Sequence, residues 1–170
     1  MDTASVVLSF LLQTASISSI GITHEHVNTA EVHCLAENVF FEARGEPKHG
    51  QYAVAHVTLN RVKHPSYPDT VCEVVGQKTK VRATGKTVCA FSWKCSGNRR
   101  ISFKTRDGKE NHRVIEQYKI ALTVAIKTLY GKAADASKGA ISFHNPHVSA
   151  PGWASRMRLT TKIGNHAFYR

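Results

Sequence analysis

The chain has 170 residues, of which 42% are hydrophobic and 21% charged, a composition that favours one globular domain over a low-complexity chain. The 23 Lys and Arg outnumber the 12 Asp and Glu and give a net charge of +11 with neutral His. Such an excess indicates an anionic partner, or a basic surface that only aids solubility.

The basic residues are spread along the chain from Lys48 to Arg170 and do not form a single arm. No zinc-finger spacing or RNA-binding aromatic motif occurs in the sequence. We therefore expect no nucleic acid as partner, although a nucleic-acid-binding module is the main alternative class. The anionic polymers of a bacterial envelope fit the charge equally well.

The first 27 residues are apolar in their middle but are interrupted by Ser, Gln and Thr. They are too short for a stable membrane span and lack the basic start of a secretory signal, because Asp2 is the only early charge. We expect an N-terminal segment that forms a helix on the domain, and a single catalytic domain over residues 28–170. An atypical export segment is the alternative. Without a signal, release would depend on another protein, as for a phage lysis enzyme.

A helix is predicted from Asn28 or Thr29, since Asn28 and Glu31 have the spacing of an N-cap and its capping box. Its apolar stripe recurs at helical spacing through Val32, Leu35, Ala36, Val39, Phe40 and Ala43. Gly45 is expected to end it in the left-handed region, and Pro47 suits the start of the next helix.

Glu42 lies on or beside this stripe, just before the corner. A carboxyl group against Val39, Phe40 and Phe41 loses solvation, which raises its pKa toward the value that a general acid needs. The alternative is a structural ion pair with Arg44 or Arg61.

The second helix is predicted over residues 48–62, followed by a short helix that Asp69 or Thr70 caps and that ends near Val75. Asn60 and Arg61, near the end of the second helix, could reach Glu42.

Alternating polar and apolar residues and turn residues predict a β-hairpin region over 78–103. A long amphipathic helix is predicted over 109–130, capped by Asp107 or Asn111 and ended by Gly131. The expected fold class is α+β, mainly helical, with a small β region.

Phe91 and Trp93 lie in the hairpin region and are interpreted either as rings that stack on sugars or as core residues. The four cysteines have no zinc-knuckle spacing. An even number of cysteines favours disulfides, and we favour the pairs Cys89–Cys95 and Cys34–Cys72 among the three possible pairings. Disulfides would mean that the protein works outside the reducing cytosol. Four buried thiols are the alternative.

The last forty residues contain a second cluster, and we expect substrate contacts from it, from the corner, from the end of the second helix and from the hairpin region. These candidate ligands are Glu46, Asn60, Phe91, Trp93, His144, Asn145, Trp153 and His166. Short strands are expected around Phe143 and Ile163. Two histidines with Glu42 would suit a zinc amidase, but no HExxH or comparable pair occurs, so neither a metal nor another cofactor is expected.

The segments NVFFEARGEPKHGQYAVAHVTLNRV, PSYPDTVCEVV, CAFSWKC, SFHNPHVSAPGW and KIGNHAFYR together resemble the cell wall hydrolase family of the spore cortex-lytic (SleB/CwlJ) type. The resemblance covers Cys34 to Arg170 and implies a lysozyme-like domain that cleaves peptidoglycan glycan strands, in a phage endolysin or a bacterial hydrolase. It also implies that Glu42, the first glutamate of EARGE, is the catalytic acid/base. The family usually has tyrosine where this chain has Phe143, so this chain has no phenol hydroxyl at that position.

Glycosidases usually employ two carboxylates, but no aspartate lies in the aromatic or histidine clusters. A single-acid mechanism is therefore favoured. Cleavage of the MurNAc–GlcNAc bond by lytic transglycosylation, with Glu42 acting alone, is the chemistry that the resemblance suggests. The alternatives are a water-using muramidase with Glu46 or a distant aspartate, an amidase that cuts the peptide stem, and a silent wall-binding module. We expect a monomer that acts in the periplasm or cell wall.

Overall fold

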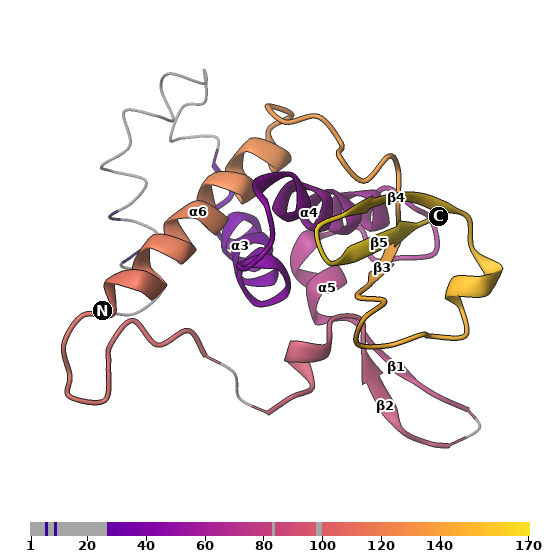
Figure 1. Cartoon of the computed structure of the whole chain (residues 1–170), viewed down its shortest axis with the longest axis horizontal. Coiled ribbons are helices and arrows are strands. Elements are labelled where there is room, and N and C mark those ends of the chain that lie inside the picture. The colour runs from indigo at the N-terminus through magenta and orange to yellow at the C-terminus, as the bar shows by residue number, and fades with distance from the viewer. Residues whose placement is uncertain (1–5, 7–8, 10–26, 83, 98–99) are drawn as a thin grey trace.

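The computed structural model describes residue 6, residue 9 and residues 27–82, 84–97 and 100–170 (Figure 1). The elements are α3 Thr29–Ala43, α4 Lys48–Val62, α5 Val71–Gly76, β1 Lys78–Lys80, β2 Thr87–Cys89, η2 Ser92–Lys94, α6 His112–Leu129, β3 Ser142–His144, η3 Ala154–Arg156, β4 Leu159–Ile163 and β5 His166–Tyr169. The expected mainly helical α+β architecture with small sheets is confirmed. The prediction of a helix over residues 1–27 lies outside the described residues, apart from Val6, Ser9 and Val27.

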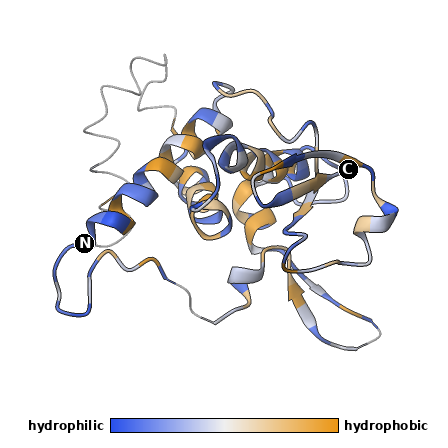
Figure 2. Cartoon of the chain, viewed as in Figure 1, coloured by the Kyte–Doolittle hydropathy of each residue, from blue (hydrophilic) through white to orange (hydrophobic). Residues whose placement is uncertain are grey.

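Helices α3 and α6 pack against each other and form most of the larger core cluster (Figure 1). Hydrophobic and hydrophilic patches alternate along α6, as an amphipathic helix requires (Figure 2). At their contact the Nδ1 atom of His33 lies 2.8 Å from the hydroxyl oxygen of Tyr118. The predicted limits of α6 are confirmed within a turn, because the Asn111 side chain caps it and Gly131 follows it with a φ of 68°. None of the described helices has the length and hydrophobicity that crossing a membrane requires.

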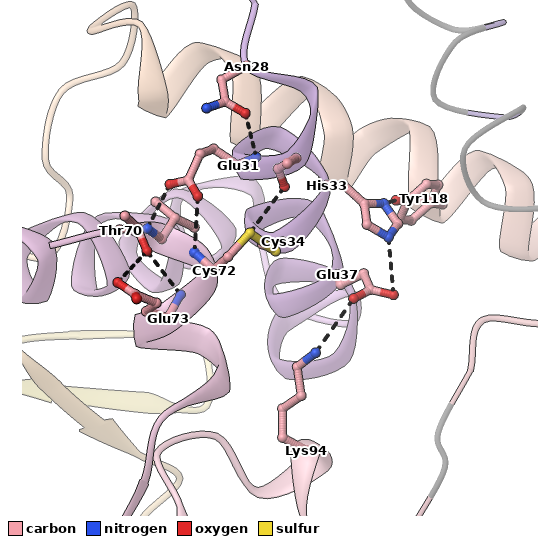
Figure 3. The surroundings of a disulfide bond; sticks show 12 residues. Asn28, Glu31, His33, Cys34, Glu37, Thr70, Cys72, Glu73, Lys94 and Tyr118 are labelled. Atoms are coloured by element: carbon pink, nitrogen blue, oxygen red, sulfur yellow. Dashed lines mark hydrogen bonds and ion pairs between the residues drawn. A yellow bond between two sulfur atoms is a disulfide. The ribbon is translucent and has the colours of Figure 1, made fainter. Parts of the chain in front are cut away.

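The start of α3 follows only half of the predicted capping box. The Asn28 side chain accepts a hydrogen bond from the Glu31 amide, as expected. The Glu31 carboxylate, however, does not return to Asn28 but accepts from the Val71 and Cys72 amides at the start of α5 (Figure 3). Glu31 therefore caps a different helix, where the positive end of the helix dipole favours a carboxylate.

Both predicted disulfides are present, Cys34–Cys72 and Cys89–Cys95. Cys34–Cys72 joins α3 to α5 beside the Glu31 contact (Figure 3). It closes a separation of 38 residues, against 6 for the other bridge. Because a longer loop loses more freedom in the unfolded chain, Cys34–Cys72 should stabilise the fold by about 1.5 kcal/mol more than Cys89–Cys95.

The corner between α3 and α4 differs from the prediction in one respect. Gly45 does not have a positive φ, and Arg44 at the C-cap is in the right-handed helical region, with a φ of −59°. The chain turns through the Glu46 amide, which donates to the Ala43 carbonyl at 2.9 Å. Pro47 precedes α4 as expected, and its carbonyl accepts from the Gly50 and Gln51 amides.

The strands of the described residues form two small antiparallel sheets. Strands β1 and β2 form a hairpin in which Thr79 is opposite Val88. Strands β3, β5 and β4 form the second sheet in that order, so the C-terminal strand is its centre. The predicted hairpin region was too long, because its strands end at Cys89 and residues 92–94 form a 3₁₀ turn. The expected strands around Phe143 and Ile163 are confirmed.

Candidate active site

Glu42 lies in the last turn of α3, just before the corner, with its side chain half-buried. Burial raises the pKa of its carboxyl group from 4.5 to about 7, and the nearby charge of Arg61 opposes that rise. Within the described part of the chain, no hydrogen bond or ion pair holds the carboxylate. The structural ion pair with Arg44 or Arg61 that the sequence allowed is therefore not formed. A carboxyl group with a pKa near 7 can both give and take a proton at neutral pH.

Arg61, near the end of α4, is the cation whose charge acts on Glu42, and it is only 8% exposed. Its Nε donates to the Ile141 carbonyl at 2.7 Å. Its guanidinium carbon lies 5.0 Å from the Phe91 ring centroid and 5.4 Å from that of Tyr67. One hydrogen bond and two ring faces thus hold the guanidinium in place. The sequence placed Arg61 near Glu42 but did not single it out as a site residue.

Arg61 lines a cleft with a volume of about 520 Å³. One wall is the face of the β1–β2 hairpin that carries Thr79 and Val88. Tyr67 and its neighbours in the loop after α4 also line the cleft, as does Ile141. Since Arg61 belongs to both the cleft and the surroundings of Glu42, we take the cleft and Glu42 as one candidate active site.

Glu46 binds the turn between β4 and β5. Its carboxylate accepts from the backbone amide and from the side-chain amide of Asn165, both at 2.9 Å. Gly164 approaches so closely, with a φ of 57°, that a Cβ there would lie 2.0 Å from Glu46 Oε2. Only glycine fits that position. Glu46, predicted as a substrate ligand, thus joins the corner to the second sheet, 119 residues away in sequence.

His166 follows this turn and is buried, with 8% of its surface exposed. Its ring packs edge-on against Phe143 and Phe168. Burial lowers its pKa below the ordinary value, Glu46 opposes the change and His144 adds to it. Burial therefore favours the neutral form of His166, and its Nδ1 has no hydrogen-bond partner among the described residues.

His144, Trp153 and Tyr169 form an aromatic cluster at the second sheet. The His144 ring stacks on Tyr169 with centroids 5.4 Å apart, and Trp153 meets both rings edge-on. Both His144 nitrogens are in hydrogen bonds, Nδ1 with the Ser149 carbonyl and Nε2 with the Tyr169 hydroxyl. Trp153 is half-buried and keeps some ring surface in contact with solvent. Substrate binding by His144 and Trp153 stays a prediction.

Asn60 and Asn145 have structural partners in this fold. Asn60 Nδ2 donates to Asp135, Ser137 and the Ala140 carbonyl, so within the described residues it holds the loop before β3 and is not a hydrogen-bond partner of Glu42. The Asn145 side chain accepts from the His147 amide in the turn that follows β3. Sequence reasoning missed Asp135 as the acceptor for Asn60, because 75 residues separate them.

Phe91 and Trp93 are core residues, so the prediction that they stack on sugars is wrong. They are 2% and 5% exposed. Trp93 stacks on Phe41 with centroids 4.4 Å apart, and its Nε1 donates to the buried Asn38 side chain at 3.0 Å. Buried rings present no face to a substrate. The other reading of the sequence, core residues beside a disulfide, is the one that the structure supports.

Among the described residues, no group of three or more His, Cys, Asp or Glu side chains is arranged to hold a metal ion.

Comparison with known proteins gives the same family as the sequence motifs. Residues 45–169 match the Cell Wall Hydrolase family. Glu42 lies three residues before the matched segment, so the match itself assigns it no role. The segment covers most of the chain, including the corner residue Glu46, the cleft and both sheets.

Two curated relatives are spore cortex-lytic enzymes. That of Halalkalibacterium halodurans is 30% identical over 138 residues, and that of Bacillus subtilis is 28% identical over the same length. These alignments cover 81% of this chain but only 34% and 37% of the relatives, so the chain spans about a third of their length.

Two solved structures have the same fold. The catalytic domain of the SleB protein of Bacillus cereus is 30% identical, with a TM-score of 0.57 over 82% of this chain and 89% of that domain. The catalytic domain of the germination-specific lytic transglycosylase SleB from Bacillus anthracis is 28% identical, with a TM-score of 0.61 over 87% of this chain and all of that domain. The motifs, the family match and these structures agree, and the chain belongs to the cell wall hydrolase family.

Proposed function

We propose that this chain is a lytic transglycosylase that cleaves the bond between MurNAc and GlcNAc in peptidoglycan, with Glu42 as its single acid/base. The observation that carries the proposal is the half-buried Glu42 carboxyl, with a pKa of about 7. The similarity to the Bacillus anthracis domain, which is named a lytic transglycosylase, also supports it.

Glu42 would act twice in this reaction. In its protonated form it gives its proton to the glycosidic oxygen as the bond from that oxygen to C1 of MurNAc breaks. As the carboxylate it then takes the proton of the C6 hydroxyl, whose oxygen bonds to C1 and closes an anhydro ring. The proton balance closes without water, and Glu42 returns to its acid form. A pKa near the working pH makes both forms accessible.

The surroundings of Glu46 and Asp135 favour a single acid/base. Hydrolytic glycosidases employ a second carboxylate as base or nucleophile. In the described part of the chain, Asn165 holds both oxygens of Glu46. Asp135 accepts from Asn60, Ser137 and Gly139. Hydrogen bonds to these carboxylates favour fixed positions over a role in proton transfer.

The reaction products distinguish the candidate activities. Mass spectrometry of fragments released from purified sacculi should show anhydro-MurNAc ends, lighter by one water than the reducing ends that a muramidase leaves. An amidase would instead release peptide stems from intact strands. Reducing ends without the anhydro form would overturn the transglycosylase proposal and favour the muramidase.

Glu46→Gln tests the muramidase alternative. Because Glu46 binds the β4–β5 turn, glutamine should lose one of two hydrogen bonds and lower the free energy of unfolding by about 1 kcal/mol. Cleavage of sacculi should fall less than tenfold, since proton transfer stays with Glu42. Thermal unfolding and sacculus cleavage measured together check this result. A variant that stays folded yet loses all cleavage would make Glu46 the second catalytic carboxylate.

We infer an extracytoplasmic site of action from a wall substrate and two disulfides. The relatives described above are bacterial and give the expected phage origin no support. The anionic envelope remains the proposed docking partner. The β1–β2 hairpin favours it, since residues 77–89 contain Lys78, Lys80, Arg82 and Lys86 and no acidic residue.

Sacculus cleavage should therefore fall as salt is raised from low to about 0.5 M, because exposed charges are screened beyond a few ångströms there. Cleavage of a short uncharged glycan should change far less, since Glu42 acts inside the site. Rates in a salt series on both substrates measure the difference. Equal responses of the two substrates would mean that the basic surface only aids solubility.

A further inference from the structure

The cleft at Arg61 has an unbalanced charge. Arg61 and His64 line it, with the polar side chains of Gln77 and Thr79, and no carboxylate does. Val88 and Ile141 add apolar surface to the same lining. Such a surface suits a ligand that combines a negative group with short apolar groups, and a neutral sugar chain alone would leave the guanidinium without an anion.

Arg61 itself lacks a full counter-charge. No ion pair to it occurs within the described residues, and its Nη1 is buried without a hydrogen-bond partner there. Glu42 is the carboxyl group whose charge it feels, and Glu42 is neutral when it is ready to act as an acid. A buried guanidinium in that state is costly unless an anion joins it.

Resting on the proposed function, we propose that this cleft is a subsite for the peptide stem of peptidoglycan, in which Arg61 pairs with a free carboxylate of the stem. The glycan backbone of a stem-bearing strand is neutral, because the lactyl group of MurNAc is amide-linked to the stem. The carboxylates of the repeating unit are therefore on the stem. The guanidinium is already fixed by Ile141 and two ring faces, so the part of Arg61 that lines the cleft is suited to form a charge-assisted hydrogen bond with a carboxylate.

The test compares two substrates that share their glycan. Short soluble strands with native stems are one, and the same strands with stem carboxylates converted to primary amides are the other. At about 0.5 M salt, which screens the exposed hairpin charges, native strands should have a kcat/KM at least tenfold higher. Because Glu42 acts on both substrates, the ratio of the two values cancels effects on proton transfer. Arg61→Gln should bring the ratio close to one.

Two tryptophan variants of the hairpin form a matched pair of test and control. Thr79 lines the cleft and Thr87 does not, although both are exposed residues of the same hairpin. Thr79→Trp should bring the ratio close to one, and Thr87→Trp should leave it as in the wild type. Thermal unfolding of each variant checks the fold.

The outcomes separate this inference from the proposed function. A wild-type ratio of one, with anhydro products from both substrates, overturns the stem subsite and keeps the transglycosylase. An equal loss on both substrates in Thr79→Trp shows that the cleft binds the glycan and also overturns the stem subsite. If the wild type cleaves neither substrate, the proposed function itself fails.

Discussion

Glu42→Gln should abolish glycan cleavage, and its rate on purified sacculi should be lower by a factor of about 10²–10⁴. Glutamine keeps the shape of the side chain but cannot give or take a proton. The loss should lie at the upper end of this range, because one group serves both proton transfers. Muropeptide release over time, followed by mass spectrometry, measures the effect.

Glu46→Gln is the matched control for this change, since it makes the same substitution four residues away. Thermal unfolding must show that Glu42→Gln remains folded. If that variant kept more than about a tenth of the wild-type rate, Glu42 would not be the acid/base.

Glu42→Gln should also stabilise the protein at alkaline pH. The Glu42 pKa is 4.5 in an ordinary environment and about 7 in the fold. Below pH 4.5 the carboxyl is neutral in both states, so it costs the fold nothing. Between pH 4.5 and 7 the unfolded chain ionises this group while the folded protein keeps it protonated, so this part of the stability is lost progressively, and the loss is complete once the folded carboxyl ionises above pH 7. Above pH 7, Glu42→Gln should therefore be more stable than the wild type by about 3 kcal/mol.

Chemical unfolding of both proteins at pH 4 and pH 8 measures this difference. The other titrating groups are the same in the two proteins, so their contributions cancel. The free energies of unfolding should agree at pH 4 and diverge at pH 8. A constant difference at both values would mean that the Glu42 pKa is not raised by the fold. A gain at pH 8 would identify Glu42 as a group whose place in the fold costs stability, as is common for catalytic residues.

Patterns close together in the sequence predicted much of the fold. Asn28, Thr70 and Asn111 each cap a helix through an amide three residues on, so the signal and its partner lie within one turn. The observed limits of α4 are the predicted ones, because they depend on Pro47 and on the end of the apolar pattern, which are also signals close together in the sequence. The family motif identified Glu42, and a half-buried place for it followed from the apolar stripe of α3.

Other features depend on contacts that only the tertiary structure decides. Glu31 has the spacing of a capping box, but its carboxylate binds α5 because the disulfide brings that helix beside it. Trp93 suits a sugar platform or a core equally well in sequence. Its burial depends on Phe41 and Asn38, which are more than fifty residues away.

The sequence by itself determined the family, the limits of the main helices and the candidate acid, because each rests on a motif or on short-range spacing. It favoured the disulfide pairing that the structure shows but left four thiols as an alternative. The tertiary structure decided what surrounds that acid. It alone set the Glu42 pKa, since desolvation depends on the packing of distant elements. It also brought the hairpin and Ile141 around Arg61 to form the cleft, and it placed Gly164 against Glu46. Burial and charge at a site are sums over neighbours from the whole chain, and no local pattern contains them.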